Sequence, residues 1–368
     1  MSTPKYLDLP DEARQLTIES RRGTFAALEA EPSTGVCERR PALLIPGFTG
    51  SKEDFIPVLQ PLASAGRRVV AIDMRGQYQS QGAHEASGYA PGELGADIIA
   101  IAEAISSDGH GLHLVGHSLG GLVAREAVLA QAAQVISLTL LSSGPGRITG
   151  QRASVLRGLL AMMTAADSTD PNGTTGPNGT ADPNGTTGTG STTDPSGSAG
   201  PSGSADAADG RLRATVERIF QEHLAPEAKA EGAPEPVIAF LHERMMKTSP
   251  TGLMAMGRYL LTCPDRTAEL ARLSRPPVLV LYGENDDAWR PAVQEQMARR
   301  LGADRVCIPG AGHSPAVEAP ETTASTLTAF WRTAEDSERR RAAGPGAGGD
   351  QAGRAASGLA AGEAKASA

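Results

Sequence analysis

A Gly-x-Ser-x-Gly pentapeptide at residues 116–120 directly follows the short apolar run 112–115, and it constrains the fold of this chain more than any other feature. A strand that ends in this pattern and opens into a helix holds the central serine on a sharp turn. Glycine two positions before and two positions after the serine removes side chains that would crowd the turn. We therefore predict that the Ser118 hydroxyl projects at the top of a sheet, where a base and a substrate can reach it.

Short apolar runs alternate with helical patterns along most of the 368 residues. This alternation predicts an α/β fold, in which helices cover both faces of a mostly parallel sheet. We expect strands at 15–20, 24–29, 42–45, 68–72, 112–115, 135–141, 278–282 and 305–308. We expect helices between them at 57–65, 91–106, 122–132, 291–301 and 320–333.

The alternation stops after residue 141 and resumes at 278, an interval far too long for a loop. Four apolar helical patterns in this interval predict a helical cap over the serine, at 155–163, 212–224, 237–246 and 252–261. Residues 167–210 lack Val, Ile, Leu, Met, aromatic, Lys and Arg side chains, so they bury too little apolar surface to become ordered. The predicted domains are a core at 1–146 and 271–333, a cap at 147–270 that contains the disordered insert 167–210, and a disordered tail at 334–368.

The composition argues against several classes of function. The formal net charge is −8 and no cluster of five or more Lys and Arg residues occurs, so nucleic acid is not expected as a partner. The three cysteines lie far apart without metal-ligand spacing, which favours reduced thiols in a cytoplasmic protein that has no metal site. The start of the chain is polar, and no run approaches the roughly 20 apolar residues of a membrane span. Abundant Ala, Gly, Arg and Pro favour a GC-rich bacterial source.

A nucleophilic serine needs a base to accept its proton, and the base needs a carboxylate that orients it and stabilises its charge. His313 is the one histidine after the last expected strand, on a glycine-containing loop that directly follows this strand. The carboxylate is expected after the preceding strand, where Asp286 lies three residues beyond the strand-ending glycine and Asp287 is the alternative. His117 precedes the serine but should point away from it on a tight turn, so we interpret it as structural. Ser118, Asp286 and His313 are therefore the expected catalytic residues.

The oxyanion of an acyl-transfer intermediate needs N–H donors. One donor is expected to be the backbone N–H of Leu119, which directly follows the serine. The second is expected from the loop after the strand 42–45, where Gly47 allows the backbone to turn and the N–H of Phe48 to point at the substrate. The sequence thus predicts an oxyanion hole made by two backbone groups.

Five motifs in this order resemble those of the α/β-hydrolase superfamily, at 46–48, 73–80, 116–120, 283–286 and 312–313. The resemblance covers roughly residues 15–333 apart from the insert. It departs from the common pattern at Tyr78, where many relatives have glycine, and at the oxyanion loop, which lacks the common His-Gly start. Neither departure removes a predicted catalytic group.

The resemblance implies a cofactor-free serine hydrolase with Ser118 as nucleophile, Asp286 as acid and His313 as base. Phe48 and Leu119 would supply the oxyanion hole. The implied substrate is a carboxylic ester of small to medium apolar character, with a thioester, lactone or amide also open, cleaved through an acyl-enzyme. The alternatives are an acyltransferase, a perhydrolase or a C–C bond hydrolase that uses the same triad, and a ligand receptor without turnover.

Overall fold

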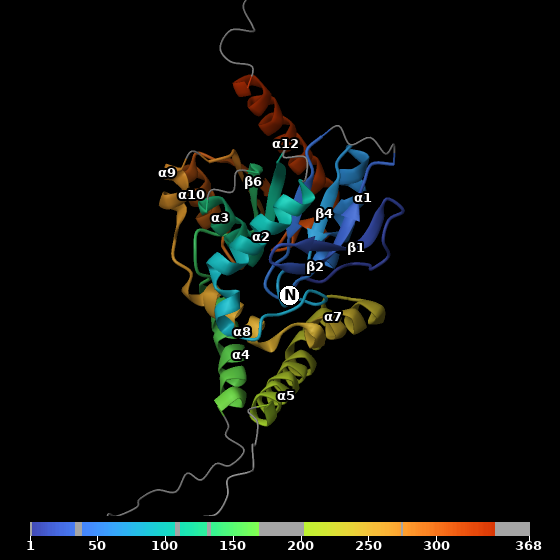
Figure 1. Cartoon of the computed structure of the whole chain (residues 1–368), viewed down its shortest axis with the longest axis vertical. Helices are drawn as coiled ribbons and strands as arrows, with labels where there is room; N and C mark the ends of the chain where they lie inside the picture. Colours follow the sequence, from blue (N-terminus) through green and yellow to red (C-terminus); the bar gives the residue numbers. More distant parts are fainter. Residues whose placement is uncertain are drawn as a thin grey trace, which may run out of the picture.

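One twisted sheet organises the molecule (Figure 1). The computed structural model describes residues 2–33, 39–106, 111–130, 134–168, 202–273 and 275–342. Within these ranges, eight strands run in the order β1-β2-β4-β3-β5-β6-β7-β8, and all neighbours from β4 to β8 are parallel. The strands are β1 (Ala13–Ser20), β2 (Gly23–Ala30), β3 (Ala42–Ile45), β4 (Val69–Ile72), β5 (Leu112–His117), β6 (Val135–Leu141), β7 (Val278–Gly283) and β8 (Asp304–Ile308). The predicted α/β class with a mostly parallel sheet is confirmed. In the described ranges, the antiparallel pairings are those of β1 with β2 and of β2 with β4.

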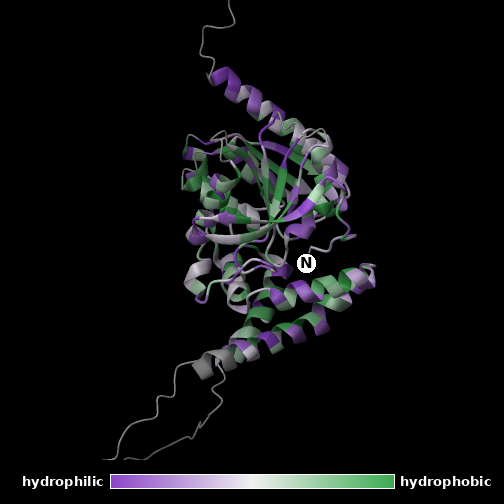
Figure 2. Ribbon diagram, turned by 45° about the vertical axis from the view of Figure 1, so that its right-hand side comes forward, coloured by the Kyte–Doolittle hydropathy of each residue, from purple (hydrophilic) through white to green (hydrophobic). Residues whose placement is uncertain are grey.

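Helices cover both faces of this sheet (Figure 1). On one face, α1 (Ile56–Ser64) packs against α12 (Pro320–Ala342). On the other face, α2 (Pro91–Ile105) packs against α3 (Leu119–Leu129), and α10 (Pro291–Leu301) joins the same apolar cluster. Every residue of β3 to β7 is buried, as expected for parallel strands covered on both sides. Figure 2 shows these strands as an apolar layer inside more polar helices.

Helix ends follow the local sequence. Helix α10 begins with Pro291, whose fixed φ suits the first turn, and ends at Gly302, which adopts a left-handed φ of 58°. Helix α8 (Pro250–Thr262) begins after Ser249, whose hydroxyl accepts a hydrogen bond from the N–H of Gly252 at 3.1 Å. These residues fix where the chain turns and therefore how the helices meet the sheet.

A helical segment lies between β6 and β7 in the chain and below the sheet in Figure 1. It consists of α4 (Gly150–Ser168), α5 (Ser202–Ile219), the π-helical turn η3 (Phe220–Leu224), α6 (Ala225–Ala230), α7 (Glu235–Lys247) and α8. Helix α4 packs against α5 and α8, whereas α9 (Thr267–Arg272) packs against α3 and α10 of the core. The division of the chain into core and cap at 147 and 270 stays a prediction. In the described ranges, no helix combines the length and apolarity that a membrane crossing requires.

Helices extend into both of the segments that the sequence predicts to be disordered. The tail predicted from residue 334 is wrong for 334–342, because α12 continues to Ala342 and buries Ala334 and Glu335 against the core. The insert predicted at 167–210 is wrong at its ends, because α4 includes 167–168 and α5 includes 202–210. Residues 169–201 of the insert and 343–368 of the tail lie outside the described residues.

Candidate active site

The turn after β5 holds Ser118 in a conformation that non-glycine residues rarely adopt, with φ 54° and ψ −118°. Close backbone packing enforces it. A Cβ atom at Gly116 would lie 2.3 Å from the carbonyl oxygen of Gly120, and one at Gly120 would lie 2.5 Å from that of Ile45. The two glycines of the pentapeptide are therefore required by contact between β5, α3 and β3. The serine sits at the end of a central strand, as its motif predicts.

Three side chains from separate parts of the chain form one hydrogen-bonded relay. The Oγ of Ser118 lies 3.0 Å from Nε2 of His313, and Nδ1 of the same ring lies 2.9 Å from Oδ1 of Asp286. Ser118 follows β5, Asp286 follows β7 and His313 follows β8, so all three side chains lie at the carboxyl ends of parallel strands. This geometry suits transfer of a proton from the serine hydroxyl to the imidazole.

Asp286 is buried, with 3% of its surface exposed. Its Oδ1 accepts from the N–H of Ala288 at 3.0 Å, and its Oδ2 accepts from Nε2 of Gln294 at 2.8 Å. Burial disfavours the carboxylate, but the hydrogen bond and charge of His313, with the bond from Gln294, hold the pKa of Asp286 below its ordinary value. The carboxyl is therefore ionised at neutral pH and stabilises a protonated imidazole.

The alternative acid, Asp287, lies apart from this relay. Its carboxylate forms an ion pair with Arg152 of α4 at 2.7 Å, and 60% of its side chain is exposed. His313 therefore contacts Asp286, whereas Asp287 connects the loop after β7 to the helical segment.

The predicted oxyanion donors flank the serine. Leu119 is the first residue of α3, where backbone N–H groups have no acceptor within the helix. Phe48 lies in the loop after β3, and a Cβ on the neighbouring Gly47 would lie 3.2 Å from that of Ser118. The side-chain amide of Gln77 donates to the carbonyls of Gly47 at 2.7 Å and Phe48 at 3.2 Å. Gln77 thus fixes the loop against the serine; the role of the two N–H groups stays a prediction.

A cavity of about 390 Å³ opens over Ser118 and His313. The core contributes the loop 47–50, and the helical segment contributes an apolar wall that includes Leu156, Leu159 and Leu260. Charged side chains also border it, among them Arg152 and Asp287. The cavity therefore offers space for an apolar group directly beside the serine hydroxyl.

Residues 42–326 match the model of the alpha/beta hydrolase family, which is well over half of the chain. The chain belongs to this family. One stretch of 109 residues is 38% identical to the Variovorax paradoxus (strain S110) protein named "Putative carbamate hydrolase RutD". This stretch is 30% of the chain and 40% of the relative, so the chain spans about two fifths of the curated relative that it matches.

Solved structures of other hydrolases share the fold. A thermophilic esterase from Thermogutta terrifontis has a TM-score of 0.56 and 20% identity, and the match covers 87% of this chain and 99% of that one. The enol-lactonase from Burkholderia xenovorans LB400 has a TM-score of 0.58 and 16% identity, with 86% and 99% covered. At these identities the likeness shows the alpha/beta hydrolase fold alone.

Further residues support the relay, and sequence reasoning assigned a role to only one of them, His117. His117, expected to be structural, donates from Nε2 to the backbone carbonyl of His313 at 2.8 Å, and burial lowers the pKa of its ring to about 3. It is therefore neutral and anchors the loop that carries His313. Gln294 lies in no predicted motif, and Gln77 lies in the motif 73–80 without a role assigned to it, so only the three-dimensional contacts give these two residues a role. In the described ranges, no group of three or more His, Cys, Asp and Glu side chains could hold a metal ion.

Proposed function

We propose that this alpha/beta hydrolase is a serine hydrolase that cleaves a carboxylic ester of a small to medium apolar substrate through an acyl-enzyme. One observation carries the proposal: the relay of Ser118, His313 and Asp286 has both of its hydrogen bonds within 3.0 Å. Nearby, the cavity places an apolar wall beside the hydroxyl, which suits an acyl chain or an apolar alcohol.

In the first half of the reaction, Ser118 attacks the acyl carbonyl while His313 accepts the hydroxyl proton. Asp286 stabilises the imidazolium that forms. The backbone N–H groups of Phe48 and Leu119 are the proposed donors to the oxyanion of the tetrahedral intermediate. When the intermediate collapses, His313 returns its proton to the leaving alcohol, and the acyl group remains on the serine.

In the second half, water replaces the alcohol. His313 removes a proton from this water as it attacks the acyl-enzyme, and a second tetrahedral intermediate forms at the same donors. Its collapse breaks the bond to Ser118 and releases the carboxylic acid, while the proton returns from His313 to the serine oxygen. The enzyme ends in its starting state and needs no cofactor for any of these steps.

The test combines labelling with kinetics. A fluorophosphonate probe should label the wild-type protein but not Ser118→Ala, and the same variant should lower kcat for a p-nitrophenyl ester by about 10⁴-fold or more. Asp286→Asn should lower kcat by about 10⁴-fold, whereas the matched variant Asp287→Asn should stay within a few-fold of wild type. Ester turnover by pure Ser118→Ala protein would refute the assignment.

The substrate panel separates the remaining chemistries. It should contain alkyl esters, a thioester, a lactone, an amide and a diketone, together with a carbamate because one relative is named for that activity. Added alcohols, amines and peroxide reveal acyl transfer or perhydrolysis through their products. A protein that binds these compounds without labelling or turnover would instead be a receptor.

A further inference from the structure

The segment 2–9 runs between the core and the helical segment before β1 begins. In Figure 1 the start of the chain lies beside α7, below the sheet. Pro4 is buried, and Leu7 and Leu9 pack against the apolar clusters on the two faces of the sheet. At the other end of the segment, Ser2 lines the cavity that also contains Ser118 and His313. The family match begins at residue 42, so the segment 2–9 lies before it in the chain and still reaches the candidate active site.

Arg244 of α7 holds Ser2 in this position. Its Nη2 donates to the backbone carbonyl of Ser2 at 2.9 Å, and its Nη1 donates to Oδ1 of Asp54 at 2.8 Å. The side chains of Arg244 and Asp54 are only 1% and 3% exposed. A buried charge is costly unless it is paired, so this ion pair fixes the guanidinium and, through it, the backbone of Ser2.

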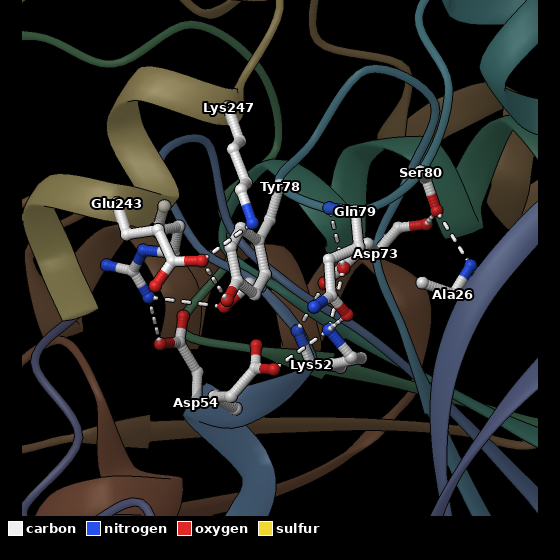
Figure 3. Close-up of polar contacts among 12 residues, drawn as sticks. Ala26, Lys52, Asp54, Asp73, Tyr78, Gln79, Ser80, Glu243 and Lys247 are labelled. Atoms are coloured by element: carbon white, nitrogen blue, oxygen red, sulfur yellow. Dashed lines mark hydrogen bonds and ion pairs between the residues drawn. The ribbon is translucent and has the colours of Figure 1, made fainter.

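Helix α7 is itself tied to the core by a second set of contacts. Figure 3 shows Glu243 and Lys247 of α7 reaching Tyr78, which lies over Lys52 of the core. The hydroxyl of Tyr78 donates to Glu243 at 3.3 Å, and Nζ of Lys52 lies 4.6 Å from the centre of the Tyr78 ring. Arg244 therefore projects from a helix whose place against the core is set independently of the segment 2–9.

We infer that the segment 2–9 is a fixed strap, and that Ser2 forms the wall of the substrate cavity that limits the size of the ester. The inference rests on the proposed function. Short esters should fit between the relay and Ser2, whereas a longer chain should meet the strap. Ser2 is thus a specificity-determining residue, and Arg244 is the positioning residue that holds it.

The experiment compares kcat/KM for p-nitrophenyl acetate and p-nitrophenyl octanoate. Ser2→Trp adds bulk to the wall, so the octanoate-to-acetate ratio should fall about tenfold or more. Arg244→Lys keeps a cation for Asp54 but loses the second donor to Ser2, so the ratio should rise about threefold or more as the wall loosens. Lys5→Trp, an exposed position on the same strap, is the matched control and should leave the ratio unchanged.

Melting temperatures show that each variant is folded before the ratios are compared. If the ratio is the same in wild type, Ser2→Trp and Lys5→Trp, the strap inference is wrong, although esterase activity that depends on Ser118 would still support the proposed function. If wild-type protein neither labels nor turns over any ester, the proposed function fails instead. The two failures are therefore distinguishable in one set of assays.

Discussion

Replacing Glu335 with glutamine should destabilise the protein by about 3–5 kcal/mol, because it removes one partner of a buried ion pair. Glu335 lies on α12, and its carboxylate accepts hydrogen bonds from the guanidinium of Arg67 and pairs with Nε2 of His113 at 3.1 Å. The side chains of Glu335 and Arg67 are 5% and 0% exposed. Trp331, one turn earlier on α12, stacks on His113 with 5.2 Å between ring centres. Loss of the carboxylate would leave Arg67 buried without its anion.

The pKa of Glu335 gives a second way to calculate this loss of stability. Burial disfavours this carboxylate, but hydrogen bonds from His113 and Arg67 outweigh the effect and lower its pKa from 4.5 to about 2. This difference in pKa between the folded and unfolded chains corresponds to about 3 kcal/mol of the free energy of unfolding. Because the folded-state pKa is the lower one, the contribution is complete above pH 4.5 and is lost as the pH falls towards 2. Burial also lowers the pKa of His113 to about 4, so its ring is neutral at pH 7.

The assay is thermal unfolding followed by circular dichroism and by tryptophan fluorescence, to which the buried Trp289 and Trp331 contribute. At pH 7 the melting temperature of Glu335→Gln should fall by about 6–10 °C, and the gap to wild type should narrow below pH 4.5. Glu338→Gln is the matched control, because this carboxylate is 42% exposed and lies 3.9 Å from Arg40; its effect should stay below about 0.5 kcal/mol. Equal melting temperatures for the two variants would refute the reasoning.

Three further changes probe the site itself. Gln294→Leu removes a donor to the carboxylate of Asp286, so kcat for an ester should fall about tenfold with little change in KM. An unchanged kcat would show that Gln294 does not assist Asp286. Gln77→Leu releases the two carbonyls of the loop after β3, and kcat should fall about tenfold or more because the proposed oxyanion donors would lose their alignment. Gly120→Ala places a Cβ 2.5 Å from the carbonyl oxygen of Ile45; chemical denaturation should show a loss of about 1–3 kcal/mol, and full stability would contradict the packing argument.

Local sequence patterns predicted the parts of the fold that depend on neighbouring residues. Strands β3 and β6 begin and end at the predicted residues, because short apolar runs buried on both faces have clear limits. The strained turn at Ser118 could be predicted since its two glycines lie two positions away on either side. The meeting of Ser118, Asp286 and His313 followed from their places after the parallel strands β5, β7 and β8. The assignment of their catalytic roles stays a prediction.

Long-range contacts between single polar residues gave no signal in the sequence. The composition becomes charged and rich in alanine from residue 334, which predicts a disordered tail. Glu335 is nevertheless buried through contacts with Arg67 and His113, more than 200 residues away. Arg244 and Ser2 are likewise 242 residues apart. Such pairs form only when helices and strands pack against one another in the tertiary structure. Hydrophobic periodicity predicts the helices and strands but not this packing.

The helical segment also has a consequence for engineering. Helix α4 ends at Ser168 and α5 begins at Ser202, and the two helices pack together at the tip remote from the sheet (Figure 1). A segment inserted between two neighbouring helix ends should leave the register of the strands and the turn at Ser118 unchanged. A fluorescent reporter or an affinity module grafted at this tip would therefore travel with the enzyme without entering its chemistry.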